Sequence, residues 1–431
     1  MKRIIVQPSP ALRGAVRIPG SKNSTLALIA AACLADEPVR LCDVPSIADI
    51  QIIEQIAEGM GLSIQRESTG QLLIDSREVH NAVIEPAKAA AFRTAYYFIG
   101  ALLAKHGRVS VGYPGGDDFV SRPMDQHVKA LTAMGARFTF HADHYVVEAA
   151  SLEGADIYFD MITSGATMNV MMAAARARGR TILRNAARDP EVVDTANLLI
   201  QMGARIRGAG TDMIVIDGVS HLNGCTYNVI PDRLIAGAFL MAAGVTGGSV
   251  TVTDVIPEHL GSCLAKLTEI GLHIETTSST ISAHATGVYR ATRVRTAMYP
   301  GFATDLQQPL TSLLLKAPGR SLISDRIYPH RFQHAAQLRR MGADIAVRSG
   351  VARLNGGKPL TGALVHASDI RAGIGLMMAG MIAEGRTTIL GVHHIERGYE
   401  HMIEDFRSLG ANIVVCQSDD EEQLWLASQA T

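Results

Sequence analysis

The chain has 431 residues, of which 47% are hydrophobic, and a formal net charge of −1. This balance excludes the basic surface of a protein that binds nucleic acid or an anionic membrane, so local cations would have to hold any anionic ligand. The first residues lack the apolar core of a signal peptide, and no apolar run approaches the ~20 residues that span a bilayer. We therefore expect a cytoplasmic protein.

The residues that commonly bind metals show no suitable pattern. Five cysteines are scattered without C-x-x-C spacing, which argues against both a disulfide framework and a zinc site. His330 and His334 are four residues apart, but no carboxylates accompany them at metal-ligand spacing. The sequence also contains neither a P-loop nor a dinucleotide-binding fingerprint. It therefore predicts no metal site and no cofactor.

The chain begins with a strand-like stretch, residues 1–6, and then enters the first of several similar units. In this unit an apolar helix over residues 26–34 precedes a strand at 38–41, an amphipathic helix over 47–60, Gly61 and a predicted hairpin. A helix that is apolar all round belongs inside a domain, whereas an amphipathic helix covers its outside. Gly61 would follow the outer helix as its C′ residue.

The same order recurs along the whole chain, with successive marker glycines 68 to 74 residues apart. The marker glycines are Gly61, Gly135, Gly203, Gly271, Gly342 and Gly410. The inner helices are expected at residues 26–34, 95–104, 166–175, 234–243, 310–315 and 370–383.

Six such units are too large for a single hydrophobic core, and three units per domain is the natural division. The sequence thus predicts an α/β protein with one domain at residues 22–229 and a second at residues 1–21 with 230–431. The leading segment would supply a strand that the second domain lacks. Two chain connections between domains suit a hinge around a cleft.

Charged residues stand where the inner helices begin. Lys22, Arg93 and Arg371 are cations at positions that the helix dipole disfavours, and an anionic ligand in the cleft would resolve this conflict. Ordinary N-capping is an equally good interpretation for three polar residues at other helix starts: Asp232, Thr304 and Ser368.

The loop over residues 113–123 is the segment that fits the repeat least. Pro114-Gly115-Gly116 predicts an irregular turn, and Asp117 and Asp118 follow it. These acids are either solvated loop charges or part of a closing lid that carries a proton donor. Arg331 and Arg397 begin outer helices of successive units. Each alone is typical of a surface, but their shared position favours one common cleft.

These features resemble the enolpyruvyl transferase family over nearly the whole chain. The resemblance rests on Pro19-Gly20-Ser21-Lys22-Asn23, on Pro114-Gly115-Gly116 before Arg122-Pro123, on residues 299–305 and on residues 396–400. It implies a two-domain inside-out α/β barrel of six βαβαββ repeats, with the active site in the interdomain cleft and no obligate protein partner. The implied reaction transfers the enolpyruvyl group of phosphoenolpyruvate to the 3-hydroxyl of UDP-N-acetylglucosamine, an early step of peptidoglycan synthesis that supports cell shape and division.

The resemblance also implies roles for individual residues. Asp305 would be the base at the sugar hydroxyl, Asp117 the lid residue that transfers a proton, and Lys22 a catalytic cation. The phosphoenolpyruvate site would comprise Lys22, Asn23, Arg122, Arg331, Arg371 and Arg397. The nucleotide-sugar site would comprise Asn23, Arg93, Arg122, Pro123, Met124, Asp125, Gln126, Thr163, Ser164, Gly165, Asp305 and Ile327.

Three positions depart from the family pattern. Asp117 replaces a lid cysteine, as in some members, and since fosfomycin alkylates that cysteine we expect insensitivity to it. Val120 replaces a glycine, and Ile235 stands where an acid is common. The acceptor could therefore be another nucleotide or shikimate 3-phosphate. A third alternative is an inert paralogue that only binds a nucleotide sugar, although the retained cations argue against it.

Overall fold

The structure is a computed structural model that describes residues 2–91, 93–113, 115 and 123–429. The chain divides into two compact units. One, here called the N-terminal unit, is Pro19–Ile230, and the other, the C-terminal unit, is Met1–Ile18 with Pro231–Thr431. Each unit has its own hydrophobic core.

Three four-stranded sheets make up the strands of the N-terminal unit. In spatial order they are β14 (Thr226–Asn228), β3 (Val39–Cys42), β5 (Gln71–Asp75) and β4 (Ser63–Ser68); β6 (Val83–Ile84), β7 (Arg108–Gly112), β9 (His144–Glu148) and β8 (Arg137–Phe140); and β10 (Asp156–Tyr158), β11 (Arg180–Arg184), β13 (Met213–Asp217) and β12 (Arg205–Arg207). The helices are α1 (Lys22–Ala32), α2 (Ala48–Met60), α3 (Pro86–Ala91), α4 (Tyr97–His106), α5 (Asp125–Ala133), α6 (Ser164–Ala174) and α7 (Pro190–Gln201), with the 3₁₀ helix η1 (Arg93–Tyr96).

The C-terminal unit repeats this plan with three further four-stranded sheets. They are β2 (Arg13–Arg17), β15 (Ser249–Thr253), β17 (Thr280–Ala285) and β16 (Leu272–Thr276); β18 (Arg293–Arg295), β19 (Gly319–Ser324), β21 (Val351–Gly356) and β20 (Asp344–Arg348); and β23 (Leu364–His366), β25 (Thr387–Leu390), β1 (Arg3–Val6) and β26 (Ile413–Cys416). A short sheet joins β22 (Leu360–Thr361) to β24 (Ala383–Glu384). The helices are α8 (Arg233–Thr246), α9 (Gly261–Ile270), α10 (Gln307–Leu314), α11 (Gln333–Arg340), α12 (Ile370–Gly380), α13 (Val392–Glu396), α14 (Met402–Ser408) and α15 (Asp419–Gln429), with 3₁₀ helices η2 (Pro257–Leu260) and η3 (Thr304–Leu306).

All six large sheets share one topology. The first two strands of each are parallel and the remaining pairs are antiparallel. Apolar inner helices such as α1, α6 and α12 are buried along almost their whole length. All six marker glycines have a positive φ, between 80° and 120°, which side chains other than glycine rarely tolerate. The predicted repeat is therefore present in the structure.

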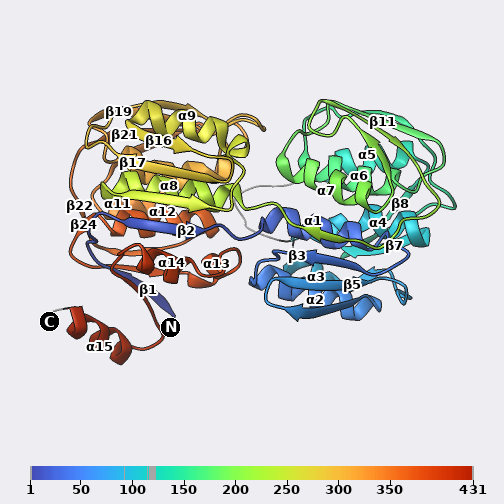
Figure 1. The fold of residues 1–431 in the computed structure, drawn as a ribbon, viewed down its shortest axis with the longest axis horizontal. Coiled ribbons are helices and arrows are strands. Elements are labelled where there is room, and N and C mark those ends of the chain that lie inside the picture. The colour runs from blue at the N-terminus through green and yellow to red at the C-terminus, as the bar shows by residue number, and fades with distance from the viewer. Residues whose placement is uncertain (1, 92, 114, 116–122, 430–431) are drawn as a thin grey trace. The chain divides into compact units, whose positions relative to one another are not determined.

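The chain start contributes more to the C-terminal unit than the sequence predicted. Both β1 and β2 lie in its sheets, and Figure 1 shows these blue strands among elements coloured yellow to red. In four repeats, the strand before an inner helix pairs with the strand after it. The other two repeats exchange partners: β2, which precedes α1, pairs with β15, whereas β14, which precedes α8, pairs with β3. In each unit, one sheet is thus completed by a strand that lies next to a point where the chain passes between the units: β2 in the C-terminal unit and β14 in the N-terminal unit.

Three local predictions were wrong. The last inner helix ends at Gly380, because β24 begins at Ala383 within the expected helix. The hairpin expected after Gly410 has only β26, since β1 takes the place of its second strand. Outer helix α7 is not simply amphipathic, because most of its first half is buried, polar residues included. Among the described residues, no helix combines the length and apolarity that a membrane crossing requires.

Candidate active site

The C-terminal unit brings Asp305, Arg331 and Arg371 together from three separate segments. Asp305 lies in η3, Arg331 lies two residues before α11, and Arg371 is in the first turn of α12. Arg331 Nη1 donates a short hydrogen bond to Asp305 Oδ1, and Arg371 Nε donates to Asp305 Oδ2 at 3.3 Å. One carboxylate therefore binds two guanidinium groups.

The two arginines of this cluster are buried, whereas the carboxylate is partly accessible. The side chains of Arg331 and Arg371 are 3% and 4% exposed, and that of Asp305 is 26% exposed. Burial raises the pKa of Asp305, but the two guanidinium groups outweigh this effect and hold that pKa well below its usual range. Asp305 is therefore ionised and partly accessible, whereas the two arginines are buried.

Asp369 and Tyr399 hold the two arginines from the other side. Asp369 caps α12, accepting hydrogen bonds from the backbone N–H groups of Arg371 and Ala372 at 2.9 and 3.2 Å. The same oxygen lies 3.4 Å from Arg331 Nη2. Arg371 Nη1 donates to the Tyr399 hydroxyl, and its guanidinium carbon lies 5.2 Å from the centre of that ring. Burial raises the pKa of Tyr399 to about 12, so the hydroxyl stays protonated.

The loop that contains Ile327 is fixed by a buried carboxylate. Asp325 accepts hydrogen bonds from the hydroxyls of Thr296 and Thr304 at 2.8 and 2.6 Å. It also accepts from the backbone N–H groups of Ile327 and Tyr328 at 3.0 and 2.9 Å. Thr304 therefore binds this acid, although N-capping was the alternative for it, and Ile327 is half-buried within the fixed turn.

Arg331 is buried and its guanidinium is paired inside the unit, which differs from the surface position typical of a lone arginine. The predicted position of Arg397 was wrong. Arg397 does not begin an outer helix, since it is the C-cap of α13 and is half-buried.

In the N-terminal unit, Lys22 is the first residue of α1, and Ser21 caps that helix. Lys22 Nζ lies 2.6 Å from the carboxylate of Asp49, whose side chain is 3% exposed. Asn23 follows on α1 and is half-buried. This lysine thus stands at a helix start beside a buried acid, which offsets the unfavourable dipole.

The start of α6 forms a second cluster of predicted residues. Thr163 caps the helix by accepting from the Ala166 N–H at 3.4 Å, and the Ser164 hydroxyl donates to Asp189 at 2.8 Å. A Cβ atom on Gly165 would lie 2.7 Å from the Tyr96 hydroxyl oxygen, so a larger residue there would force that side chain to shift.

The remaining predicted residues lie around α5 and the loop before it. Gln126 is buried and pairs with Asp160, accepting from its N–H at 2.9 Å and donating to its carboxylate at 3.2 Å. Asp125 is the first residue of α5, after an exposed Pro123 and a half-buried Met124. Arg93 is the first residue of η1. Six residues discussed from the sequence lie outside the described residues: Pro114, Gly116, Asp117, Asp118, Val120 and Arg122.

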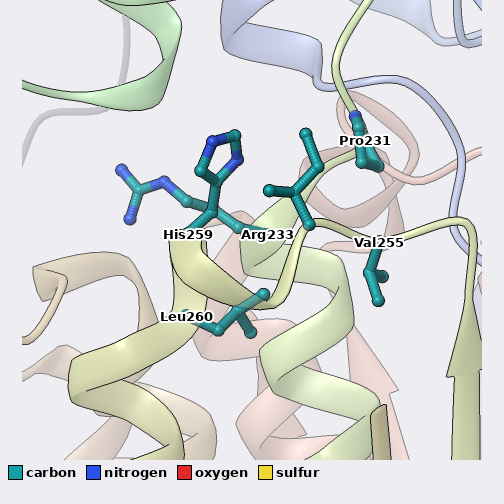
Figure 2. A pocket seen from close by; sticks show the side chains of 6 residues that line it. Pro231, Arg233, Val255, His259 and Leu260 are labelled. Carbon is teal, nitrogen blue, oxygen red and sulfur yellow. The ribbon is translucent and has the colours of Figure 1, made fainter. Parts of the chain in front are cut away.

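The start of α8 has a different environment. Asp232 is an ordinary N-cap, accepting from the N–H groups of Leu234 and Ile235 at 2.8 and 3.1 Å. Arg233 and His259 line a small pocket together with Pro231, Val255, Ile256 and Leu260 (Figure 2). Of the predicted site residues that the structure describes, none lines this pocket. Ile235, which replaces the common acid, is buried.

Comparison with known proteins assigns the chain to a family. The family model of EPSP synthase (3-phosphoshikimate 1-carboxyvinyltransferase) matches residues 6–406. The chain is 46% identical over 411 residues to UDP-N-acetylglucosamine 1-carboxyvinyltransferase 2 of Geobacillus kaustophilus, which covers 95% of this chain and 96% of that relative. The chain belongs to the enolpyruvyl transferase family. A UDP-N-acetylglucosamine 1-carboxyvinyltransferase of Streptococcus pneumoniae is 45% identical over 415 residues, covering 96% and 99% of the two chains.

Solved structures agree with the enolpyruvyl transferase fold. The crystal structure of the enolpyruvyl transferase NikO from Streptomyces tendae matches with a TM-score of 0.87 at 25% identity, covering 97% of this chain and 99% of that one. An EPSP synthase from Acinetobacter baumannii matches with a TM-score of 0.72 at 20% identity, covering 97% and 100%, which bears on the fold alone. The predicted two-domain α/β fold is confirmed.

Asp369, Tyr399 and Asp49 belong to the polar clusters of this enolpyruvyl transferase but were not predicted as site residues. An acid at a helix start and a tyrosine two residues after Arg397 could have marked Asp369 and Tyr399. Asp49 gave no such signal, because an acid in the first turn of a helix is ordinary. Its pairing with Lys22 depends on how α1 and α2 pack.

Proposed function

We propose that this enolpyruvyl transferase acts on phosphoenolpyruvate and UDP-N-acetylglucosamine, forming an enolpyruvyl ether at the sugar 3-oxygen and releasing phosphate. The printed names of the relatives from G. kaustophilus and S. pneumoniae support this acceptor. The observation that carries the proposal is the cluster of Asp305, Arg331 and Arg371. It combines a partly exposed carboxylate with two buried cations, which suits a base beside an anion site.

The proposed substrate roles follow the family pattern. Lys22, Arg122 and Arg397 would bind the phosphate of phosphoenolpyruvate, and Arg331 and Arg371 its carboxylate. The nucleotide sugar would contact the segment from Arg122 to Gln126 and residues further along the chain: Asn23, Arg93, Thr163, Ser164, Gly165, Asp305 and Ile327.

The ion pairs of Asp305 suggest how the base becomes active. Asp305 is a poor base while Arg331 and Arg371 bind it, because they lower its pKa. The carboxylate of phosphoenolpyruvate would compete for the same two guanidinium groups. Once they turn to the ligand, the pKa of Asp305 rises and it can accept the proton of the sugar hydroxyl. Substrate binding and base activation would thus be one event.

The proposed chemistry is an addition followed by an elimination. As Asp305 takes the hydroxyl proton, the sugar 3-oxygen bonds to C2 of phosphoenolpyruvate, and Asp117 supplies a proton to C3. The resulting tetrahedral ketal loses a C3 proton and its phosphate group, which restores the double bond. The cations at Lys22 and Arg397 would stabilise the departing phosphate.

The proposal extends to inhibition and cellular context. With Asp117 in place of the lid cysteine, the enzyme would be insensitive to fosfomycin. The reaction would occur in the cytoplasm, as the first committed step of peptidoglycan precursor synthesis.

Phosphate release with an acceptor panel tests the proposal. Phosphoenolpyruvate is combined with UDP-N-acetylglucosamine, with other UDP-linked nucleotides or with shikimate 3-phosphate. We expect phosphate only with UDP-N-acetylglucosamine. Phosphate release with only one of the other acceptors would show that this acceptor is the substrate. No phosphate release with any acceptor would indicate an inert nucleotide-sugar-binding protein.

A further inference from the structure

Helix α7 differs from the outer helices of the other repeats, because three polar residues of its first two turns are buried. They are Glu191, Asp194 and Thr195. The helix contacts α1 and α6, two of the inner helices whose starts carry predicted substrate residues (Figure 1). Burying a carboxylate costs free energy unless hydrogen bonds compensate it. The buried acids of α7 therefore require hydrogen-bonding partners.

Asp194 reaches the start of α1. The hydroxyl of Ser24 donates a short hydrogen bond to Asp194 Oδ2, and the Tyr227 hydroxyl donates to Oδ1 at 2.6 Å. Ser24 lies one residue after Asn23 and two after Lys22, in the first turn of α1. Asp194 is only 1% exposed, so solvent cannot replace these donors if they are lost.

Asp194 also lies close to the second chain connection. Its Oδ2 atom is 3.5 Å from the backbone nitrogen of Ile230, and the Ile230 carbonyl accepts from the Ser21 N–H at 2.7 Å. Ser21 is the N-cap of α1. The carboxylate therefore fixes the first turn of α1 both directly and through the segment beside it.

Asp189 reaches the start of α6 from the same helix. It is the N-cap residue of α7, and it accepts the Ser164 hydroxyl at 2.8 Å. Ser164 is the first residue of α6 and precedes Gly165, whose close approach to Tyr96 leaves little room for movement. Two carboxylates on one helix thus bind the first turns of two inner helices.

We propose that α7 is a positioning element, in which Asp194 aligns the phosphoenolpyruvate residues on α1 and Asp189 aligns the nucleotide-sugar residues on α6. This inference rests on the proposed function. Neither acid needs to touch a substrate. Each acts through a serine hydroxyl on the helix start that it holds, and a displacement of about 1 Å at a binding group can strongly weaken its effect.

The test compares Asp194→Asn with Asp189→Asn by steady-state phosphate release, varying each substrate in turn. An asparagine places an amide donor against a hydroxyl donor, so one hydrogen bond is lost with little change in volume. We expect Asp194→Asn to raise the KM for phosphoenolpyruvate about tenfold and to leave that for UDP-N-acetylglucosamine within about twofold. Asp189→Asn should do the reverse.

Two further variants separate positioning from general damage. Ser24→Ala should reproduce the effect of Asp194→Asn while leaving the acid in place. Thr195→Val is the matched control on the same helix, since the buried Thr195 hydroxyl donates within α7, to the Glu191 carbonyl at 2.9 Å. It should leave both KM values unchanged.

The rate of phosphate release by the wild-type enzyme distinguishes failure of the proposed function from failure of the inference about α7. If the wild-type enzyme releases no phosphate with this substrate pair, the proposed function is overturned. If it is active but both acid variants raise both KM values equally, or Thr195→Val raises them as much, α7 is only structural and the inference is wrong.

Discussion

Asp305 shows how one carboxylate can serve two purposes at different stages. In the structure it neutralises two buried arginines, which would otherwise be costly charges inside the unit. If Asp305 moves away, Arg331 still has Asp369 as a hydrogen-bonding partner and Arg371 still has Tyr399. Neither arginine would then be buried without a partner. Its 26% exposure makes it the member of the cluster that can meet a sugar hydroxyl.

Replacing Asp305 tests its role as the base. Asp305→Asn should lower the turnover rate by about 1,000-fold, since an amide cannot accept the hydroxyl proton. Binding of UDP-N-acetylglucosamine, measured by calorimetry, should change by less than about fivefold. Asp254→Asn, which removes an exposed partner of Arg17, is the control and should keep full activity. Near-normal turnover of Asp305→Asn would refute the assignment.

The raised pKa of Asp194 predicts how the free energy of unfolding depends on pH. Burial raises the pKa of Asp194 from 3.8 to about 6, against the hydrogen bonds from Ser24 and Tyr227 that lower it. A raised folded-state pKa contributes stability that is complete below pH 3.8 and is lost as the pH rises through about 6. Two pKa units correspond to about 3 kcal/mol.

Asp194→Asn has no such titration, so its stability relative to the wild type should rise by about 2 to 3 kcal/mol between pH 4 and pH 7. Denaturant unfolding of the full chain at several pH values measures this difference. A constant difference across that range would mean that Asp194 titrates normally in the folded state.

At the scale of the element, one arrangement recurs at the starts of inner helices. In three repeats, a side chain at the helix start pairs with an acid that lies 21 to 27 residues later, after the next strand. The pairs are Lys22 with Asp49, Ser164 with Asp189, and Thr304 with Asp325. Each pair joins the start of an inner helix to the segment that follows the next strand. The repeat therefore supplies contacts that fix these helix starts.

The sequence predicted these helices well but not their polar partners. Apolar runs locate α1, α6 and α10, and the marker glycines locate the ends of the outer helices, because both patterns lie in the local sequence. The pairing of Lys22 with Asp49 depends instead on tertiary packing. The same holds for α7, whose buried Asp194 finds partners on α1 and β14, far from it in sequence.

The closest approach between two inner helices allows a packing test. A Cβ atom on Gly100 of α4 would lie 2.0 Å from the Asn169 carbonyl oxygen of α6. Gly100→Ala should therefore lower stability by about 3 kcal/mol, since the backbones must separate. Gly261→Ala, in a helix where a Cβ atom meets nothing within 4 Å, is the matched control and should be neutral or slightly stabilising. Equal unfolding midpoints for the two variants would contradict this packing.

At the scale of the whole molecule, the two units differ in how the chain builds them. The N-terminal unit is one continuous segment, and strand β14 completes its first sheet. The C-terminal unit is discontinuous, since β1 and β2 come from the chain start. Sequence patterns predicted a contribution from that segment, but the exchange of β2 and β14 could not be predicted, because local residues do not determine which distant strand becomes the partner.

Fragments test this difference directly. Residues 19–230 should unfold cooperatively on their own, because all three of their sheets and their core are complete. Residues 231–431 lack two strands and should not fold alone. Adding residues 1–18 as a separate peptide should restore cooperative unfolding. A stable 231–431 fragment without the peptide would show that β1 and β2 are dispensable.

The central claim is that the chain joins an enolpyruvyl group to the 3-oxygen of UDP-N-acetylglucosamine. The most direct measurement is carbon-13 NMR of the product made from phosphoenolpyruvate labelled at C3. We predict that the labelled methylene appears in an enol ether with long-range coupling to the sugar 3-position, together with one phosphate per product. A label that remains in phosphoenolpyruvate, or that appears at another position of the acceptor, would contradict the claim.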